Sequence, residues 1–353
     1  MAYIEKRKSG YRVQVRRRGA PSLSRTFDLK ADAESWAREI ERELQRGNVE
    51  ALRNDASRIT VEAVAERFEV SELPKRRSAS ARMYFKAARK QFGAYALGNV
   101  RSVDVAKWRD DLLDSGLSAQ SVIHHLNSLS SLFTYAAREL SIPLPAGHPV
   151  RSIRKPALPP PRDRRLQAGE FEALLRSARS PGAATGLPEI ITLAVETSAR
   201  LSELLALRWK DIDLDERIAV VRGAHGEQTK NGDPYRIVAL SQAAVTALRA
   251  LPRRIDGQVF TWKTVSGFES IWRRCLARAR RQRAKDLEAN KREPEPDFLA
   301  NLRFHDLRHE ATSRLFEKDL GIMEVASMTG HKSLAMLKRY THVEAKRLAA
   351  KLG

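Results

Sequence analysis

The stretch GHKSLAMLKRYTH, residues 330–342, places a tyrosine, Tyr340, beside two cationic side chains and a histidine. Leu334, Leu337 and Tyr340 recur every three residues, which predicts a short amphipathic helix whose tyrosine faces a core. A phenol among cations can also be a nucleophile, because nearby positive charge makes its proton easier to remove. The rest of the chain decides between a packed helix tail and a reacting tyrosine.

The composition predicts an anionic partner. The 353 residues include 64 Lys+Arg against 43 Asp+Glu, a formal net charge of +21 that is spread along the whole chain. Nucleic acid fits better than a membrane surface, because we find no long amphipathic helix with a bulky apolar face. No apolar run approaches a membrane span, and the N-terminal residues lack the apolar block of a secretory signal, so we expect a cytoplasmic protein. The single cysteine, Cys275, excludes an internal disulfide and a cysteine-based zinc site.

The first fifty residues predict a three-stranded sheet covered by one helix. Tyr11, Val13 and Val15 alternate with polar residues, as in a half-buried strand. The following segment places one apolar helical face at Ala33, Trp36, Ala37, Ile40 and Leu44, and Gly47 is expected to end that helix. The other face of the sheet would carry the DNA-binding candidates Arg12, Arg16 and Arg18, since a basic β-ribbon can enter a DNA groove. A solvated strand face is the alternative.

Residues 60–140 show only helical periodicity, which predicts a small bundle. Arg82, Lys86, Arg89 and Lys90 share one helix face and could lie on phosphates, although such a stripe is more often a hydrated surface. The next residues are rich in proline and arginine, which is typical of an extended linker, and Arg154 and Lys155 within it are further candidates for DNA contact.

The candidate catalytic residues all lie after residue 163. Arg200 lies at a break at Ser198-Ala199 between two apolar helices, with Glu203 three positions on; a surface salt bridge is the alternative. A three-stranded antiparallel sheet is predicted next, with Lys230 at its Asn231-Gly232 hairpin, where it could equally be an exposed turn lysine.

Histidines complete the candidate site. His305 and Arg308 are three residues apart and share one side of a predicted helix. His305 and His309 have the spacing of a metal pair, but the glutamate of the zincin motif and a third ligand are absent, so no metal site is expected. Gly330 is expected to end a short helix and to place His331 at the mouth of a cavity.

The order of these motifs, SARLSELLALRWKDID, TKNGDPYRIVAL, FHDLRHEATS, TGHKS and LKRYTH, resembles that of the tyrosine site-specific recombinases of the phage integrase family. Within that family it is most similar to integrase and shufflon-type invertase catalytic domains. The resemblance implies a mainly α, multidomain α+β fold with small β-sheets. It implies an arm-type DNA-binding domain at 1–50, a helical core-binding (SAM-like) domain at 57–145, a basic linker at 146–162 and a catalytic domain at 163–353.

The resemblance also implies a role for each matching residue. Tyr340 corresponds to the nucleophile, His305 and Arg308 to the H-x-x-R pair, and the others are Arg200 as first arginine with Glu203 as its supporting acid, Lys230 as hairpin lysine and His331 as second histidine. One departure is Ser198, which replaces a glycine usual in the family and is expected to stiffen that turn.

The chemistry of these residue types agrees with the implied roles. Attack on a phosphodiester gathers negative charge, which two guanidinium groups and a histidine N–H can stabilise without a metal or another cofactor. Tyr340, with a reference pKa of about 10, needs a base, for which we expect His305, and Lys230 is the expected acid for the leaving 5′-hydroxyl.

The implied function is integration, excision or inversion of double-stranded DNA through a 3′-phosphotyrosyl intermediate. The implied assembly is a tetramer on two paired sites near the nucleoid, with accessory DNA-bending proteins as possible partners. The alternatives are an inactive DNA-binding or architectural protein and a type IB topoisomerase-like enzyme.

Overall fold

The computed structural model describes residues 2–16, 22–46, 59–76, 79–144, 146–223 and 233–340. The chain divides into two compact units, residues 1–160 and 161–353, and the division falls inside the predicted linker. The described chain is mostly helical and contains two small three-stranded antiparallel sheets. This confirms the predicted fold class. No helix among the described residues has both the length and the apolar character that crossing a membrane requires.

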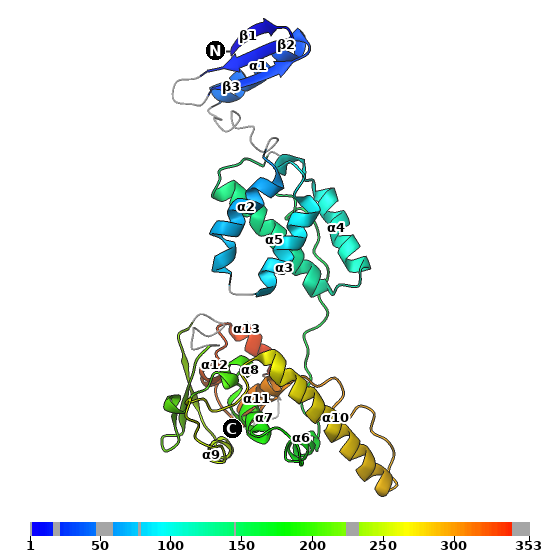
Figure 1. Ribbon diagram of the computed structural model, residues 1–353, viewed down its shortest axis with the longest axis vertical. Helices are drawn as coiled ribbons and strands as arrows, with labels where there is room; N and C mark the ends of the chain where they lie inside the picture. Colours follow the sequence, from blue (N-terminus) through cyan, green and yellow to red (C-terminus); the bar gives the residue numbers. More distant parts are fainter. Residues whose placement is uncertain are drawn as a thin grey trace, which may run out of the picture. The chain divides into compact units, whose positions relative to one another are not determined.

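The first sheet is covered by one helix (Figure 1), and the side chains between them form a small core of their own. Strands β1 (Ala2–Arg7), β2 (Gly10–Val15) and β3 (Leu23–Phe27) pair in that order, each antiparallel to the next. Val13 and Val15 are buried against α1 (Lys30–Gln45), because alternate residues of a strand face the same side. The helix contributes the predicted apolar face, of which Ala33, Ala37, Ile40 and Leu44 are buried and Trp36 is partly buried.

The remainder of the first unit is a helical bundle. Its elements are α2 (Val61–Ser71), η3 (Leu73–Lys75), α3 (Ala79–Phe92), η4 (Leu97–Asn99), α4 (Ser102–Asp114) and α5 (Ala119–Arg138). Thr60 and Ser118 cap α2 and α5 by accepting hydrogen bonds from backbone N–H groups. α5 contacts α2, α3 and α4, and the bundle closes around a core that includes Phe68, Phe92 and Phe133.

The second unit surrounds a helix that is apolar on nearly all sides. This helix, α7 (Leu187–Thr197), packs between α9 (Gln242–Arg249) and α11 (Asp306–Glu317), and buries Ile190, Ile191 and Leu193. The other elements are α6 (Glu170–Ala178), α8 (Leu201–Leu205), η5 (Trp209–Asp211), β4 (Ile212–Asp213), β5 (Ile218–Val221), β6 (Arg236–Ala239), α10 (Val265–Ala289), α12 (Ile322–Thr329), α13 (Leu334–Leu337) and η7 (Lys338–Tyr340). The strands pair in the order β4-β5-β6, as predicted.

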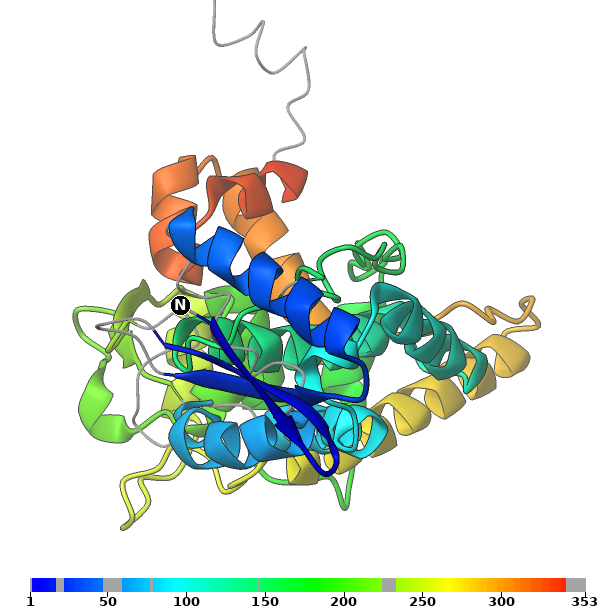
Figure 2. The same cartoon turned by 90° about the horizontal axis from the view of Figure 1, so that it is seen from above.

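The long helix α10 carries the cysteine of the chain. α10 runs unbroken (Figures 1 and 2) and packs against α6. Cys275 is fully buried in this interface, where its Sγ lies 3.6 Å from Ser177 Oγ. Burial raises the pKa of the Cys275 thiol, so the group stays protonated at neutral pH.

Candidate active site

The break between α7 and α8 positions the first candidate residues. Ser198 adopts a left-handed backbone conformation with φ 54° and ψ 21°, which costs a non-glycine residue roughly 1–2 kcal/mol. Its hydroxyl lies 3.0 Å from Thr312 Oγ1, and its carbonyl oxygen accepts a hydrogen bond from Nη1 of Arg308. These bonds offset the strain and turn the chain so that Arg200 occupies the N-cap of α8.

Glu203 holds two arginines at once. The Arg200 backbone N–H donates to Glu203 Oε2 at 2.8 Å, and Arg200 Nη1 donates to Oε1 at 2.7 Å. Arg236 Nη2, from β6, donates to the same Oε2 at 2.8 Å. Burial opposes ionisation of this carboxyl, but the hydrogen bond and charge of Arg236, together with Arg200, lower the pKa of Glu203 to about 2.

Arg308 is buried beside these groups. Its side chain reaches from α11 to the α12 end, where Nη2 donates to the Thr329 carbonyl oxygen at 2.6 Å. Burial and the charges of Arg200 and Arg236 lower the pKa of Arg308 to about 9, so the group is still cationic at neutral pH. Three guanidinium groups therefore lie around the Glu203 carboxylate. Their excess positive charge favours an anion between them.

His331 follows the end of α12. Gly330 is the left-handed C-cap with φ 69°, as predicted. The Thr329 hydroxyl donates to the Val325 carbonyl oxygen at 2.7 Å and lies 2.6 Å from His331 Nδ1. Because the hydroxyl has one hydrogen, Nδ1 is the donor in the second bond and Nε2 carries the lone pair. Burial, followed by the charges of Arg308 and Arg200, lowers the pKa of His331 to about 4.

Tyr340 is both packed and in contact with polar groups. Its ring packs against the small core of Leu315, Val325 and Leu337. Its hydroxyl lies within hydrogen-bond distance of His309 Nδ1 and accepts a bond from Arg339 Nη2 at 2.9 Å. The packing of the Tyr340 ring in a core is therefore compatible with a role of its hydroxyl as a nucleophile.

His309 is the histidine that contacts the tyrosine hydroxyl. Burial, followed by the charges of Arg339 and His305, lowers the pKa of His309 to about 4, so it is uncharged at neutral pH. His305 is exposed at the N-cap of α11, with its ring 5.3 Å from that of His309.

The structure brings Arg200, Arg308, His331 and Tyr340 into one neighbourhood, with His305 at its exposed side. Lys230 lies outside the described residues. Sequence reasoning missed His309, Arg236 and Arg339 as members of this group. A signal existed for Arg236, which shares the alternation of the buried Val238 and Leu240 and is therefore an arginine on the inward face of a strand.

The DNA-binding candidates of the bundle differ in their contacts. On α3, Arg82, Lys86 and Lys90 are exposed. Arg89 instead forms ion pairs with Glu62 and Glu69, donating at 2.8 Å and 2.6 Å. Its charge is thus already partly neutralised by carboxylates of α2.

The remaining DNA-binding candidates lie on the first sheet and in the linker. Arg12 Nη2 lies 3.4 Å from Ser24 Oγ on β3, and Arg16 is exposed after β2, whereas Arg18 lies outside the described residues. Arg154 and Lys155 are exposed, and Lys155 Nζ donates to Asn127 Oδ1 at 2.9 Å.

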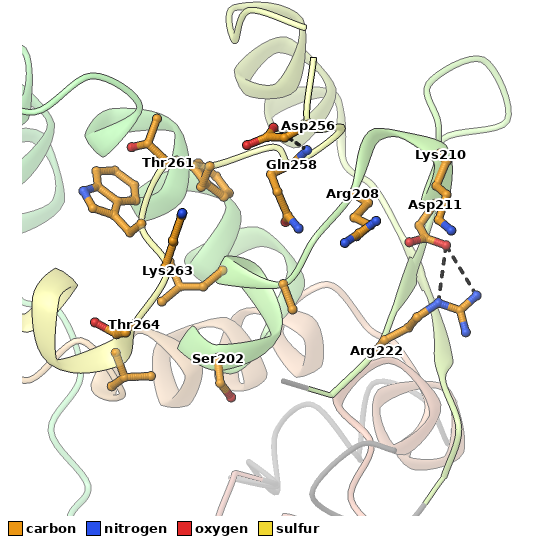
Figure 3. A pocket seen from close by; sticks show the side chains of 15 residues that line it. Ser202, Arg208, Lys210, Asp211, Arg222, Asp256, Gln258, Thr261, Lys263 and Thr264 are labelled. Carbon is orange, nitrogen blue, oxygen red and sulfur yellow. Dashed lines mark hydrogen bonds and ion pairs between the residues drawn. The ribbon is translucent and has the colours of Figure 1, made fainter. Parts of the chain in front are cut away.

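A cavity of about 940 Å³ adjoins α8 (Figure 3). Ser202 lines it two residues after Arg200, and Arg208 and Lys263 reach into it from opposite sides of the view. Lys210 and Arg222 add positive charge, while Asp211, which bonds Arg222, and Asp256 add negative charge. Cations outnumber carboxylates in its described lining, so phosphate groups can be accommodated beside the arginine cluster.

A family model and the sequence of a known protein both match this chain. The sequence model described as Phage integrase family matches residues 164–347. The Shufflon-specific DNA recombinase of Escherichia coli is 38% identical over 264 residues, which are 72% of this chain and 61% of that protein. The chain therefore matches less than two thirds of the length of this relative.

Two solved structures share the fold. The Tn1549 transposon integrase in complex with transposon right end DNA matches with a TM-score of 0.64 and 17% identity, over 83% of this chain and 98% of that one. A lambda integrase tetramer bound to a Holliday junction matches with a TM-score of 0.58 and 20% identity, over 96% of this chain and 94% of that one.

Proposed function

Since the chain belongs to the phage integrase family, we propose that it recombines double-stranded DNA at specific sites through a 3′-phosphotyrosyl intermediate on Tyr340. The observation that carries this proposal is the cluster of Arg200, Arg236 and Arg308 around one carboxylate, with the Tyr340 hydroxyl on the same unit. Three cations that share one carboxylate retain excess positive charge, which suits a diester phosphate, and a nearby phenol supplies the attacking oxygen.

The proposed step exchanges one phosphate ester for another. The Tyr340 oxygen forms a bond to phosphorus, the bond from phosphorus to the 5′-oxygen breaks, and the 3′-oxygen keeps its bond. Arg200 and Arg308 stabilise the charge on the non-bridging oxygens. His331 joins them once the charge of the phosphate has raised its pKa, because donation from Nε2 requires a second proton.

Two protons move in this step. The contacts favour His309 over His305 as acceptor of the tyrosine proton, since His309 Nδ1 touches the hydroxyl and is uncharged at neutral pH. Lys230 supplies a proton to the leaving 5′-oxygen in this proposal. When the 5′-hydroxyl of another strand attacks the phosphotyrosine, the same events run in reverse and the strands are joined.

Binding requires surfaces beyond the reacting groups. We assign backbone contacts to the cavity beside α8 and to the exposed Arg82, Lys86 and Lys90 of α3. The lambda integrase in the matched structure is a tetramer on a Holliday junction. We infer a tetramer on two paired sites for this chain, acting at the nucleoid in the cytoplasm with accessory DNA-bending proteins.

The test is to trap the covalent intermediate. The substrate is DNA that carries the core site, the site assigned to residues 57–353, with a nick close to the cleavage position. After the attack its short 5′-hydroxyl fragment diffuses away, so ligation cannot reverse the reaction. We expect a covalent protein–DNA complex in EDTA, and peptide mapping should place the 3′-phosphate on Tyr340. Tyr340→Phe should bind the same DNA and form no adduct, whereas the control Tyr235→Phe, on an exposed tyrosine of the same unit, should behave as wild type.

The outcomes separate the candidate functions. An adduct at another residue, or specific binding without an adduct, would leave a DNA-binding protein and remove the proposed reaction. Relaxation of supercoiled DNA without strand exchange between paired sites would point to a topoisomerase.

A further inference from the structure

Arg236 is a buried arginine outside the set that the sequence assigns to the reaction. It begins β6, and its side chain is 9% exposed. Its Nη2 donates to Glu203 Oε2 at 2.8 Å, and its Nε donates to the Met328 carbonyl oxygen at 2.9 Å. The remaining nitrogen, Nη1, is buried and has no hydrogen-bond partner in the described part of the chain.

Arg236 contacts two segments, and each segment holds a different residue of the proposed reaction. Glu203 holds both the backbone and the guanidinium of Arg200. Met328 belongs to the last turn of α12, after which Gly330 turns the chain into His331. The Arg236 side chain also packs on that turn, since a Cβ on Gly330 would lie 3.2 Å from Arg236 Cδ. One guanidinium therefore joins α8, β6 and the end of α12.

We propose that Arg236 is a positioning residue of the catalytic cluster, which sets the places of Arg200 and His331 by bridging the Glu203 carboxylate and the last turn of α12. This inference rests on the proposed function for its kinetic consequence. A planar fork suits the role, because it directs separate N–H groups at a carboxylate and a carbonyl oxygen in fixed geometry. A lysine ammonium at this position can reach one of them and leaves the other unbound.

Arg236 also keeps Glu203 charged. The charged groups that face Glu203 are Arg200 at the start of its own helix, Arg236 on β6 and Arg308 on α11. Without Arg236, the burial of Glu203 is opposed by fewer cations, so its pKa rises from about 2. A protonated Glu203 no longer holds Arg200 by charge. The rate of an Arg236 variant should therefore fall on the acid side at a higher pH than the rate of wild type.

The first experiment compares Arg236→Gln and Arg236→Lys with Arg249→Ala. Arg249 lies on α9 with a 60% exposed side chain, so its variant matches the loss of one positive charge away from the cluster. We expect Arg236→Gln to bind core-site DNA within a few-fold of wild type and to cleave it about tenfold to a hundredfold more slowly in single turnovers, the scale for losing a group that orients a reacting residue. Arg236→Lys should recover part of this rate, and Arg249→Ala should match wild type.

The second experiment needs no turnover. The histidines are labelled with ¹⁵N, and NMR follows the tautomer and pKa of His331, assigned with His331→Asn. In Arg236→Gln we expect the Nδ1–H tautomer to be lost or the pKa to move from about 4 toward its ordinary value. In Arg236→Lys the change should be smaller.

Failure of the inference can be told apart from failure of the proposed function. Unchanged His331 signals together with unchanged cleavage and acid limb in both Arg236 variants would overturn the positioning role. Equal loss of DNA binding and cleavage, with no shift in the pH profile, would also overturn it, as a purely structural role predicts. If wild type forms no adduct but His331 shifts in the variants, the proposed reaction fails while the positioning role stands.

Discussion

A hydroxyl passes its proton to an atom that it contacts, and the Tyr340 hydroxyl contacts His309. We expect His309→Ala to lower the rate of cleavage by about a hundredfold or more, the usual scale for general base catalysis, and His305→Ala to have a smaller effect. The measurement is single-turnover adduct formation from pH 5 to 9, with DNA binding as the control. A larger loss in His305→Ala than in His309→Ala would restore the role that the sequence motif assigned to His305.

Residues with a distinctive spacing were the ones that sequence could identify. Three signals can be read along the sequence alone: the H-x-x-R spacing, the helix break before Arg200 and the position of Tyr340. The contact between His309 and Tyr340 joins residues that are 31 positions apart, and it depends on how η7 packs on α11. No periodic pattern in the local sequence predicts that packing.

At the scale of elements, α11 and the turn after α12 carry two half-buried histidines that are uncharged at neutral pH, so the stability of this part of the fold should depend on pH. The pKa values of His309 and His331 are about 4 in the folded chain, against an ordinary 6.5. Between these values the unfolded chain binds more protons than the folded chain, so acid favours unfolding. The stabilisation is complete above about pH 6.5 and is lost as the pH falls toward 4.

We therefore expect the melting temperature of the second unit to be lower at pH 5 than at pH 7, measured by calorimetry. The double variant His309→Asn, His331→Asn should have a flatter profile over this interval. An equally steep profile in the double variant would mean that other groups carry the acid sensitivity.

Secondary structure was largely predictable because its causes are local. Alternation in β2, the caps Thr60 and Ser118, and the stop at Gly330 are each determined by a few neighbouring residues. The state of Arg89 was not predictable from the stripe on α3, because its carboxylate partners come from α2 across the bundle. Ser198 shows the same limit, since the bonds that relieve its strain come from α11.

For the whole molecule, a net charge of +21 should make DNA affinity strongly dependent on salt. The separate small core of β1–β3 and α1 supports the prediction that residues 1–50 read their own class of site. A fragment of residues 57–353 should therefore bind and cleave core-site DNA, lose affinity for a second class of site, and show a shallower dependence of log K on log salt at that second class. Gel-shift titrations at several salt concentrations test this, and a fragment that binds every site as the full chain does would contradict it.

Because the thiol of Cys275 is buried, the chain is suited to site-specific fluorescent labelling. Because the natural cysteine is enclosed between α10 and α6 and remains protonated, a maleimide dye will be directed to any cysteine introduced on the surface. No background substitution is then needed before a donor dye is attached to α3 and an acceptor dye to the exposed face of α9. Energy transfer between such dyes would report whether the distance between the two units changes when DNA is added.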